Sequence, residues 1–159
     1  MRNRKQTQKT ISQLLTHRLT AISGALTRSA GLRYRREFDV SLGEWSALGL
    51  LGQDPQLTVN RLAARAGLDK AQMSRIVSKL VERGYVEREP GARRSTRLTL
   101  TSSGKDIYAG LLGAANERDA ELHGSIEPAK MQIFEEVLEQ LTARAREIEA
   151  AEMDQSPES

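Results

Sequence analysis

Two helical segments and a basic hairpin pattern between Leu57 and Leu100 constrain the fold more than any other part of the chain. Thr58 is a typical helix N-cap, and Gly67 readily takes the left-handed conformation that ends a helix. These two residues predict a helix through about Arg65. Asp69 then caps a second helix, and Gln72 stands where a capping box requires a partner. The sequence therefore predicts two helices joined by a tight turn.

The residues after Gly84 change from a helical to a strand-like pattern. Pro90 and Gly91 predict a turn, and residues 96–100 predict a returning strand. Two helices joined by a tight turn form a helix-turn-helix, whose second helix enters the major groove of DNA. With the hairpin added, the pattern is that of a winged helix-turn-helix. The predicted fold class is mainly α with a small β-hairpin, and DNA binding is the favoured function.

The second helix separates into an apolar face and a polar face. The apolar side chains expected to pack on the first helix are Met73, Ile76, Val77, Leu80 and Val81. On the polar face, Gln72 suits pairing with adenine and Arg75 suits guanine, so both are expected to read base edges. The other candidate DNA-binding residues on the two helices, several of them suited to phosphate contact, are Arg61, Lys70, Ser74, Ser78 and Lys79. The alternative for this face is a solvated charged surface.

Arginines cluster around the predicted hairpin tip, at positions 93, 94 and 97. Arg93, Arg94 and Arg97 are expected to contact DNA, with the arginine pair entering a neighbouring minor groove, whose negative potential attracts guanidinium groups. The alternative is a hairpin edge protected by charge against aggregation.

Charge is divided unevenly along the chain, although the whole chain carries only +3. Residues 1–36 contain nine Lys or Arg and no acid, and residues 58–105 contain eleven basic and four acidic residues. Residues 37–57 contain four acids and no base, and residues 106–159 contain thirteen acidic and four basic residues. A basic central module followed by an acidic end is expected if only one part of the protein faces phosphate.

Amphipathic helices flank the central module. The sequence predicts one helix over about residues 9–33, a second through about 51 after a capping box at Ser41, a third from Thr101 or Ser102, and a last one from Pro128. Their apolar stripes favour pairing with a second copy of the chain in a symmetric dimer. We therefore expect residues 1–36 plus 102–150 to form a dimerisation region and residues 37–101 to form the DNA-binding region. The alternative is internal helix packing in a monomer.

Other features narrow the class of protein. The chain has no cysteine, which excludes disulfides and thiolate metal sites. Its first residues have charge without the apolar segment of a secretory signal, and no run approaches the length that spans a membrane. We expect a cytoplasmic protein with no membrane partner, no cofactor and a disordered tail over residues 151–159.

Taken together, these residues resemble the MarR family of bacterial transcriptional regulators. The resemblance extends from about Thr10 to Ile148 and is most specific in Gly67-Leu68-Asp69-Lys70, in residues 73–77, in residues 80–88 and in the wing ending at Thr101. It implies a homodimer, a pseudo-palindromic operator, and repression relieved by a small aromatic or phenolic ligand. Ala92 departs from the family, which often has an aspartate at that place in the wing tip. Arg61 stands where an acidic residue is common and offers a cation to phosphate.

The resemblance also implies an effector pocket between the dimerisation helices and the DNA-binding lobe. The candidate ligand-binding residues are His17, Arg18, Trp45 and Tyr108. An aromatic carboxylate would gain a charge-assisted hydrogen bond from His17 or Arg18 and a flat contact with Trp45. The alternatives are core packing for Trp45, a satisfied interface residue for His17 and a dimer salt bridge for Arg18.

Three other functions compete with this interpretation. An enzyme is poorly supported, because Ser102-Ser103-Gly104-Lys105 matches a Ser-x-x-Lys pattern but lacks its companion motifs. A metal-responsive regulator would use His17 and His123 with acidic neighbours, at a spacing that matches no familiar ligand set. A sequence-tolerant architectural protein would bind DNA through phosphate alone, which Gln72 and Arg75 argue against.

Overall fold

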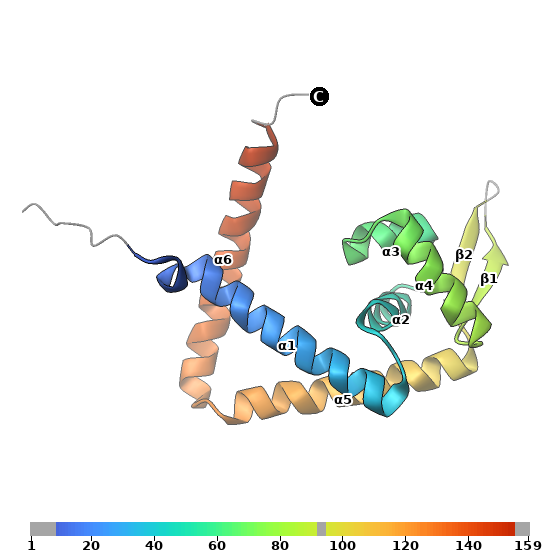
Figure 1. Ribbon diagram of the computed structural model, residues 1–159, viewed down its shortest axis with the longest axis horizontal. Coiled ribbons are helices and arrows are strands. Elements are labelled where there is room, and N and C mark those ends of the chain that lie inside the picture. The colour runs from blue at the N-terminus through green and yellow to red at the C-terminus, as the bar shows by residue number, and fades with distance from the viewer. Residues whose placement is uncertain (1–8, 92–94, 155–159) are drawn as a thin grey trace, which may run out of the picture. The chain divides into compact units, whose positions relative to one another are not determined.

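The structure is a computed structural model that describes residues 9–91 and 95–154. In chain order its elements are η1 (Ile11–Gln13), α1 (Leu15–Phe38), α2 (Leu42–Gln53), α3 (Val59–Ala66), α4 (Lys70–Glu82), β1 (Val86–Pro90), β2 (Thr96–Leu100), α5 (Ser102–Gly124) and α6 (Pro128–Asp154) (Figure 1). They form two compact units, the first ending at Ala115 and the second beginning at Asn116, so that α5 belongs to both. The mainly α fold with a two-stranded hairpin confirms the predicted fold class.

The core of the first unit lies between α2, α3, α4, the hairpin and the first half of α5. The largest fully buried side chains include Leu48, Leu62, Met73, Leu80, Leu98 and Leu111. The hairpin is antiparallel, with Val86 opposite Leu100 and Pro90 opposite Thr96. Leu57 adds a single bridge to Leu98, which ties the segment before α3 to the wing. The helix-turn-helix and its wing therefore share one core.

The helices start where side-chain capping predicted. Ser41 and Glu44 form a capping box at α2, and the Thr58 hydroxyl accepts a hydrogen bond from the Arg61 amide at α3. The Thr101 hydroxyl accepts a hydrogen bond from the Gly104 amide at α5, so Ser102–Lys105 forms the first turn of a helix. The last helix begins at Pro128, as expected.

Both predicted ends of the first long helix were wrong. The chain forms a short 3₁₀ turn capped by Thr10, whose backbone amide donates to the Gln13 side chain, and Leu14 is then extended, so α1 begins only at Leu15. At its other end α1 continues to Phe38 and stops at Asp39, which takes the left-handed conformation at φ 52°. The stop signal is an aspartate where the sequence rule looks for glycine, which explains the missed boundary.

The last helix also runs beyond its expected end. The predicted disordered tail began at residue 151, whereas α6 continues through Asp154. Alanines and an unbroken helical pattern in this segment favour one more turn. Residues 155–159 lie outside the described residues, as do Arg93 and Arg94 at the hairpin tip.

Gly104 allows α5 to lie directly against the segment that follows α4. A β-carbon at this position would meet the backbone carbonyl oxygen of Tyr85. That carbonyl already accepts a hydrogen bond from the Thr101 amide at 3.1 Å. The absent side chain of Gly104 therefore permits the junction between the DNA-binding module and α5.

Candidate nucleic-acid interface

One face of helix α4 packs against the core, and the opposite face is exposed. Met73, Val77 and Leu80 are fully buried, while Ile76 and Val81 are half-buried against the same core, which confirms the predicted apolar face. At the start of α4 the Asp69 carboxylate accepts a hydrogen bond from the Gln72 amide at 2.8 Å. Within the described chain the Gln72 side chain does not return the second bond of a capping box, so that detail was wrong. A buried underside lets α4 present its outer face as a rigid surface.

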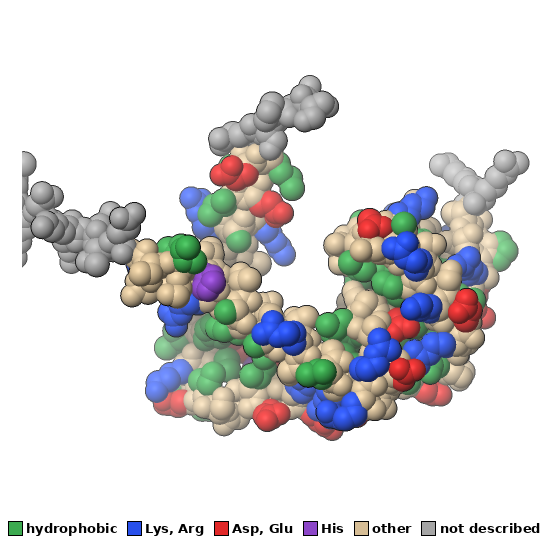
Figure 2. Space-filling view, viewed as in Figure 1, with side chains coloured by type: hydrophobic (Ala, Val, Ile, Leu, Met, Phe, Trp, Pro, Cys, Tyr) green, Lys and Arg blue, Asp and Glu red, His purple; other side chains and the backbone are tan. Residues whose placement is uncertain are grey.

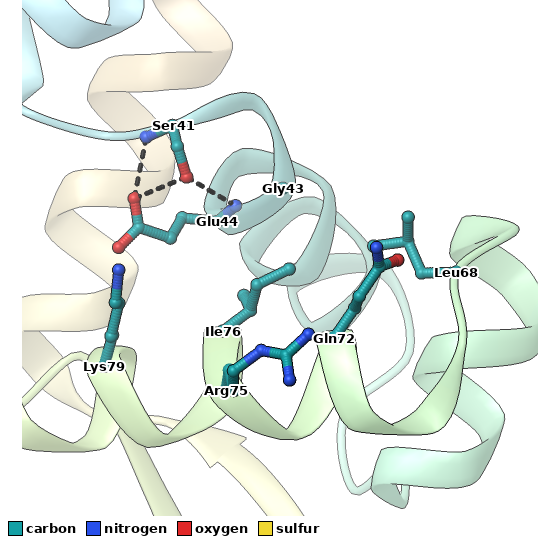
Figure 3. A pocket seen from close by; sticks show the side chains of 8 residues that line it. All are labelled: Ser41, Gly43, Glu44, Leu68, Gln72, Arg75, Ile76 and Lys79. Atoms are coloured by element: carbon teal, nitrogen blue, oxygen red, sulfur yellow. Dashed lines mark hydrogen bonds between the residues drawn. The ribbon is translucent and has the colours of Figure 1, made fainter.

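The outer face of α4 carries a row of exposed polar side chains. Gln72, Arg75 and Lys79 are exposed and lie on one side of the helix, along a shallow hollow of about 400 Å³ (Figure 3). The opposite wall of the hollow is formed by Ser41, Gly43 and Glu44 at the start of α2. Lys and Arg side chains gather over α3, α4 and the hairpin in the space-filling view (Figure 2). This row can offer amide, guanidinium and ammonium donors together.

The remaining predicted residues of the two helices divide by exposure. Arg61 and Lys70 are exposed, whereas Ser74 and Ser78 are half-buried. The Ser78 hydroxyl accepts a hydrogen bond from the Arg88 guanidinium at 3.2 Å. Arg88 was missed from the sequence, because nothing in the strand pattern shows that β1 places it beside α4. The structure thus adds an exposed arginine from the wing to the polar face.

Arg97 lies further inside the module than a wing-tip arginine. It is half-buried, and its guanidinium donates to the Gln56 side chain at 2.8 Å. Gln56 has a left-handed backbone at φ 73°, and its backbone N–H donates to the Leu98 carbonyl. Arg97 therefore links the wing strand to the segment before α3. Arg93 and Arg94 fall in the part that the structure does not describe.

A buried carboxylate supports the wall of the hollow. Glu44 is only 5% exposed and accepts hydrogen bonds from the Ser41 amide and hydroxyl, both at 2.7 Å (Figure 3). Burial raises the pKa of Glu44, but these hydrogen bonds and the nearby Arg83 guanidinium outweigh burial and leave the pKa below its usual value. Glu44 is therefore ionised at neutral pH and anchors the start of α2 beside α4.

The predicted ligand-binding residues fall into two separate groups. Trp45 packs between two tyrosines, with ring centroids 5.5 Å from Tyr34 and 6.1 Å from Tyr108. His17 and Arg18 are exposed in the first turns of α1. Since His17 precedes Tyr34 by seventeen residues on one helix, the two lie about 25 Å apart. Within a single chain, the four candidates do not form one site.

The structure gives little support to the competing metal site. Among the described residues, no three His, Asp or Glu side chains are grouped as metal ligands would be. His123 lies 3.7 Å from Asp119 in the same helix, a pair without a third ligand in the described chain.

None of the described helices is both long and apolar enough to cross a membrane.

A helix-turn-helix with a β-hairpin wing and an exposed basic face on its second helix defines a DNA-binding transcriptional regulator. Comparison with known proteins agrees. The family model described as MarR family matches residues 38–95. The regulator SarZ of Staphylococcus saprophyticus is 32% identical over 100 residues, which cover 59% of this chain and 68% of SarZ. The regulator TcaR of Staphylococcus aureus is 33% identical over 85 residues, covering 51% of this chain and 56% of TcaR.

Solved structures show the same architecture. A MarR/EmrR family regulator from Acinetobacter sp. ADP1 superposes with a TM-score of 0.74 at 25% identity, covering 87% of this chain and 99% of that one. A MarR family regulator from Silicibacter pomeroyi gives 0.71 at 27% identity, covering 84% and 90%. The chain belongs to the MarR family of transcriptional regulators, as its sequence motifs predicted.

Proposed function

We propose that this regulator is a homodimeric repressor that binds a pseudo-palindromic operator and releases it when a small aromatic or phenolic ligand binds. The observation that carries the DNA part is the exposed row of Gln72, Arg75 and Lys79 on a helix whose other face packs against the core. Two structures of similar fold were solved with DNA, FabT of Streptococcus pneumoniae and MepR of Staphylococcus aureus. Their TM-scores are 0.73 and 0.71, at 18% and 19% identity.

Each side chain of this face has a proposed role. Gln72 and Arg75, on the N-terminal half of α4, would meet base edges in the major groove. Lys79, Lys70, Arg61, Ser74 and Ser78 would contact phosphate and set the position of the helix. Arg88, held by Ser78, would add a further cation beside these contacts. Arg93, Arg94 and Arg97 would contact DNA from the wing, with the arginine pair in a neighbouring minor groove.

Exposed apolar side chains outside the DNA-binding core support the homodimer. On α6, Ile133, Phe134, Val137 and Leu138 are each at least 41% exposed. On the N-terminal segment and α1, Ile11, Leu15 and Ile22 are each at least 49% exposed. Apolar surface of this extent marks an interaction site, and a second copy offers an identical apolar surface to cover it. We propose that residues 1–36 and 102–150 provide this interface.

A ligand would act by shifting the population of dimer geometries. Tyr108 lines a hollow of about 420 Å³ together with Leu51, Gln56 and Lys105, so a carboxylate there could pair with the Lys105 ammonium. A MarR family protein of Mycobacterium tuberculosis, with a TM-score of 0.68 at 24% identity, was solved with p-aminosalicylic acid. To release DNA, the ligand must bind the DNA-incompetent geometry more tightly than the competent one. His17 and Arg18 would join such a site only from a second copy.

The homodimer is tested by sedimentation at about micromolar concentration. We expect the wild-type protein to sediment at twice the chain mass and to bind one operator duplex as two chains. Phe134→Asp places a charge in the proposed interface, so we expect it to sediment at the single-chain mass, because an unpaired buried charge is costly. Gln132→Asp adds the same charge at an exposed polar position of α6 and should remain dimeric. A wild-type protein that sediments as one chain would contradict the proposal.

A further inference from the structure

Arg83, at the C-terminal end of α4, connects segments that lie far apart in the sequence. Its guanidinium donates to the backbone carbonyl of Asp39 at 2.8 Å. It also lies 3.6 Å from the carboxylates of both Asp39 and Glu44, and 4.9 Å from the centre of the Tyr85 ring. One side chain therefore joins the end of α4 to the connection between α1 and α2.

That connection is itself held rigidly. Asp39 is left-handed, its amide donates to the Arg35 carbonyl at 3.1 Å, and its carboxylate pairs with the Arg35 guanidinium at 3.2 Å. Val40 is fully buried, and its amide donates to the Tyr34 carbonyl at 3.2 Å. Glu44 is fixed by the capping box at the start of α2. Arg83 thus binds a connection that is itself held in place by hydrogen bonds and burial.

The strength of the link comes from two of its contacts. The Asp39 carboxylate is 76% exposed, so its pairing with Arg83 adds little in water. The hydrogen bond to the Asp39 carbonyl is charge-assisted, and the Glu44 carboxylate is buried. A cation at the C-terminal end of α4 is also favoured by the helix dipole. These contacts fix both the place and the direction of the helix end.

A change in the direction of α4 at Arg83 would displace the opposite end of the helix most. Gln72 lies eleven residues before Arg83, about 16 Å along the helix axis. A tilt of about 10° at the Arg83 end would move Gln72 by about 3 Å, close to the rise of about 3.4 Å per base pair. A tilt of this size would therefore shift the base-reading residues by nearly one base pair.

We propose that Arg83 is a positioning residue that sets the half-site spacing the regulator accepts, by fixing the direction of α4 relative to α1. This inference rests on the proposed homodimer, in which α1 contributes to the interface and α4 reads DNA. Two copies of a fixed α1–α4 geometry place two recognition helices at one separation. Loosening that geometry in each copy widens the range of separations that the dimer can bind.

The test measures affinity for duplexes whose two half-sites differ in separation by one base pair at a time, together with a single half-site duplex. For the wild-type protein we expect one optimum, with affinity about tenfold lower one base pair to either side. For Arg83→Gln we expect this penalty to fall to about threefold, with affinity for the single half-site changed by less than about twofold. Arg83→Lys keeps the charge but replaces the planar guanidinium fork by a single ammonium nitrogen, so we expect its penalty to be intermediate. Arg65→Gln removes another ion-paired arginine of the same module, that with Asp54, and should keep the wild-type profile.

The outcomes separate the positioning role from the dimer itself. If the wild-type protein shows no spacing optimum, the proposed dimeric function fails and the role of Arg83 fails with it. If the wild-type optimum is sharp and Arg83→Gln retains it, only the role of Arg83 is overturned. Equal loss of affinity for every duplex, the single half-site included, would show a general structural role and would also overturn the proposal. Should Arg83→Gln fail to fold, Arg83→Lys decides, and a wild-type profile for that variant contradicts the proposal.

Discussion

Replacing Arg75 by alanine should remove most of the preference for one base at one position of each half-site. Arg75 is exposed, lies on the same face of α4 as Gln72, and has no ion-pair partner in the part of the chain that the structure describes. Its guanidinium is therefore available to pair with guanine, a contact that discriminates by about 1–3 kcal/mol. We expect about a tenfold to hundredfold loss of affinity for the preferred operator. Affinities for single-base variants at that position should become nearly equal.

Lys79→Ala provides the matched control on the same helix. Lys79 lies four residues after Arg75, about one turn further along the exposed face, where a contact with phosphate is expected. Its replacement should weaken binding to all sequences alike. It should also reduce the slope of log affinity against log salt concentration by about one, the loss of one phosphate contact. Binding isotherms at several salt concentrations measure both effects. If Arg75→Ala also weakened every sequence equally, Arg75 would be a phosphate contact and not a reader of bases.

Gly104→Ala should destabilise the protein by about 1–3 kcal/mol, the usual cost of forcing an extra methyl group into a packed site. The new β-carbon would meet the Tyr85 carbonyl oxygen, which belongs to the backbone and is held by the Thr101 amide. Neither atom can move aside as a flexible side chain would. The measurement is the midpoint of urea unfolding, with DNA affinity measured on the folded fraction.

Gly113→Ala tests whether this loss is local to Gly104. Gly113 lies in the same helix, and apart from the adjacent helix backbone no atom of the described residues stands within 4 Å of a β-carbon built there. Alanine is the better helix former, so we expect a gain of about 0.5–1 kcal/mol. If both variants destabilised the protein equally, the contact between Gly104 and Tyr85 would not explain the first result.

The sequence predicted those parts of the fold that depend on local chemistry. Ser41, Thr58 and Asp69 cap their helices through backbone amides three residues away, so short patterns reveal them. The apolar spacing of α4 likewise predicted that Met73 and Leu80 are buried. The end of α1 was missed because a left-handed aspartate replaces the expected glycine.

The parts that could not be predicted depend on contacts between distant residues. Arg83 bonds to Asp39 across 44 positions, and Arg97 bonds to Gln56 across 41. Arg88 joins the polar face only because β1 turns back beside α4. No local pattern carries such pairings. In the same way, the sequence placed His17 beside Trp45 in one pocket, whereas the length of α1 separates them within a chain.

The most direct test of a dimeric, sequence-reading regulator is selection of bound duplexes from a random pool at about physiological salt. The account predicts enrichment of an inverted repeat whose half-site centres lie about 10 base pairs apart. Such a repeat would require both the base contacts of α4 and the pairing of two chains. Retained binding without any enriched sequence would contradict it, because Gln72 and Arg75 would then contact only the DNA backbone and the protein would bind DNA as a sequence-tolerant architectural protein.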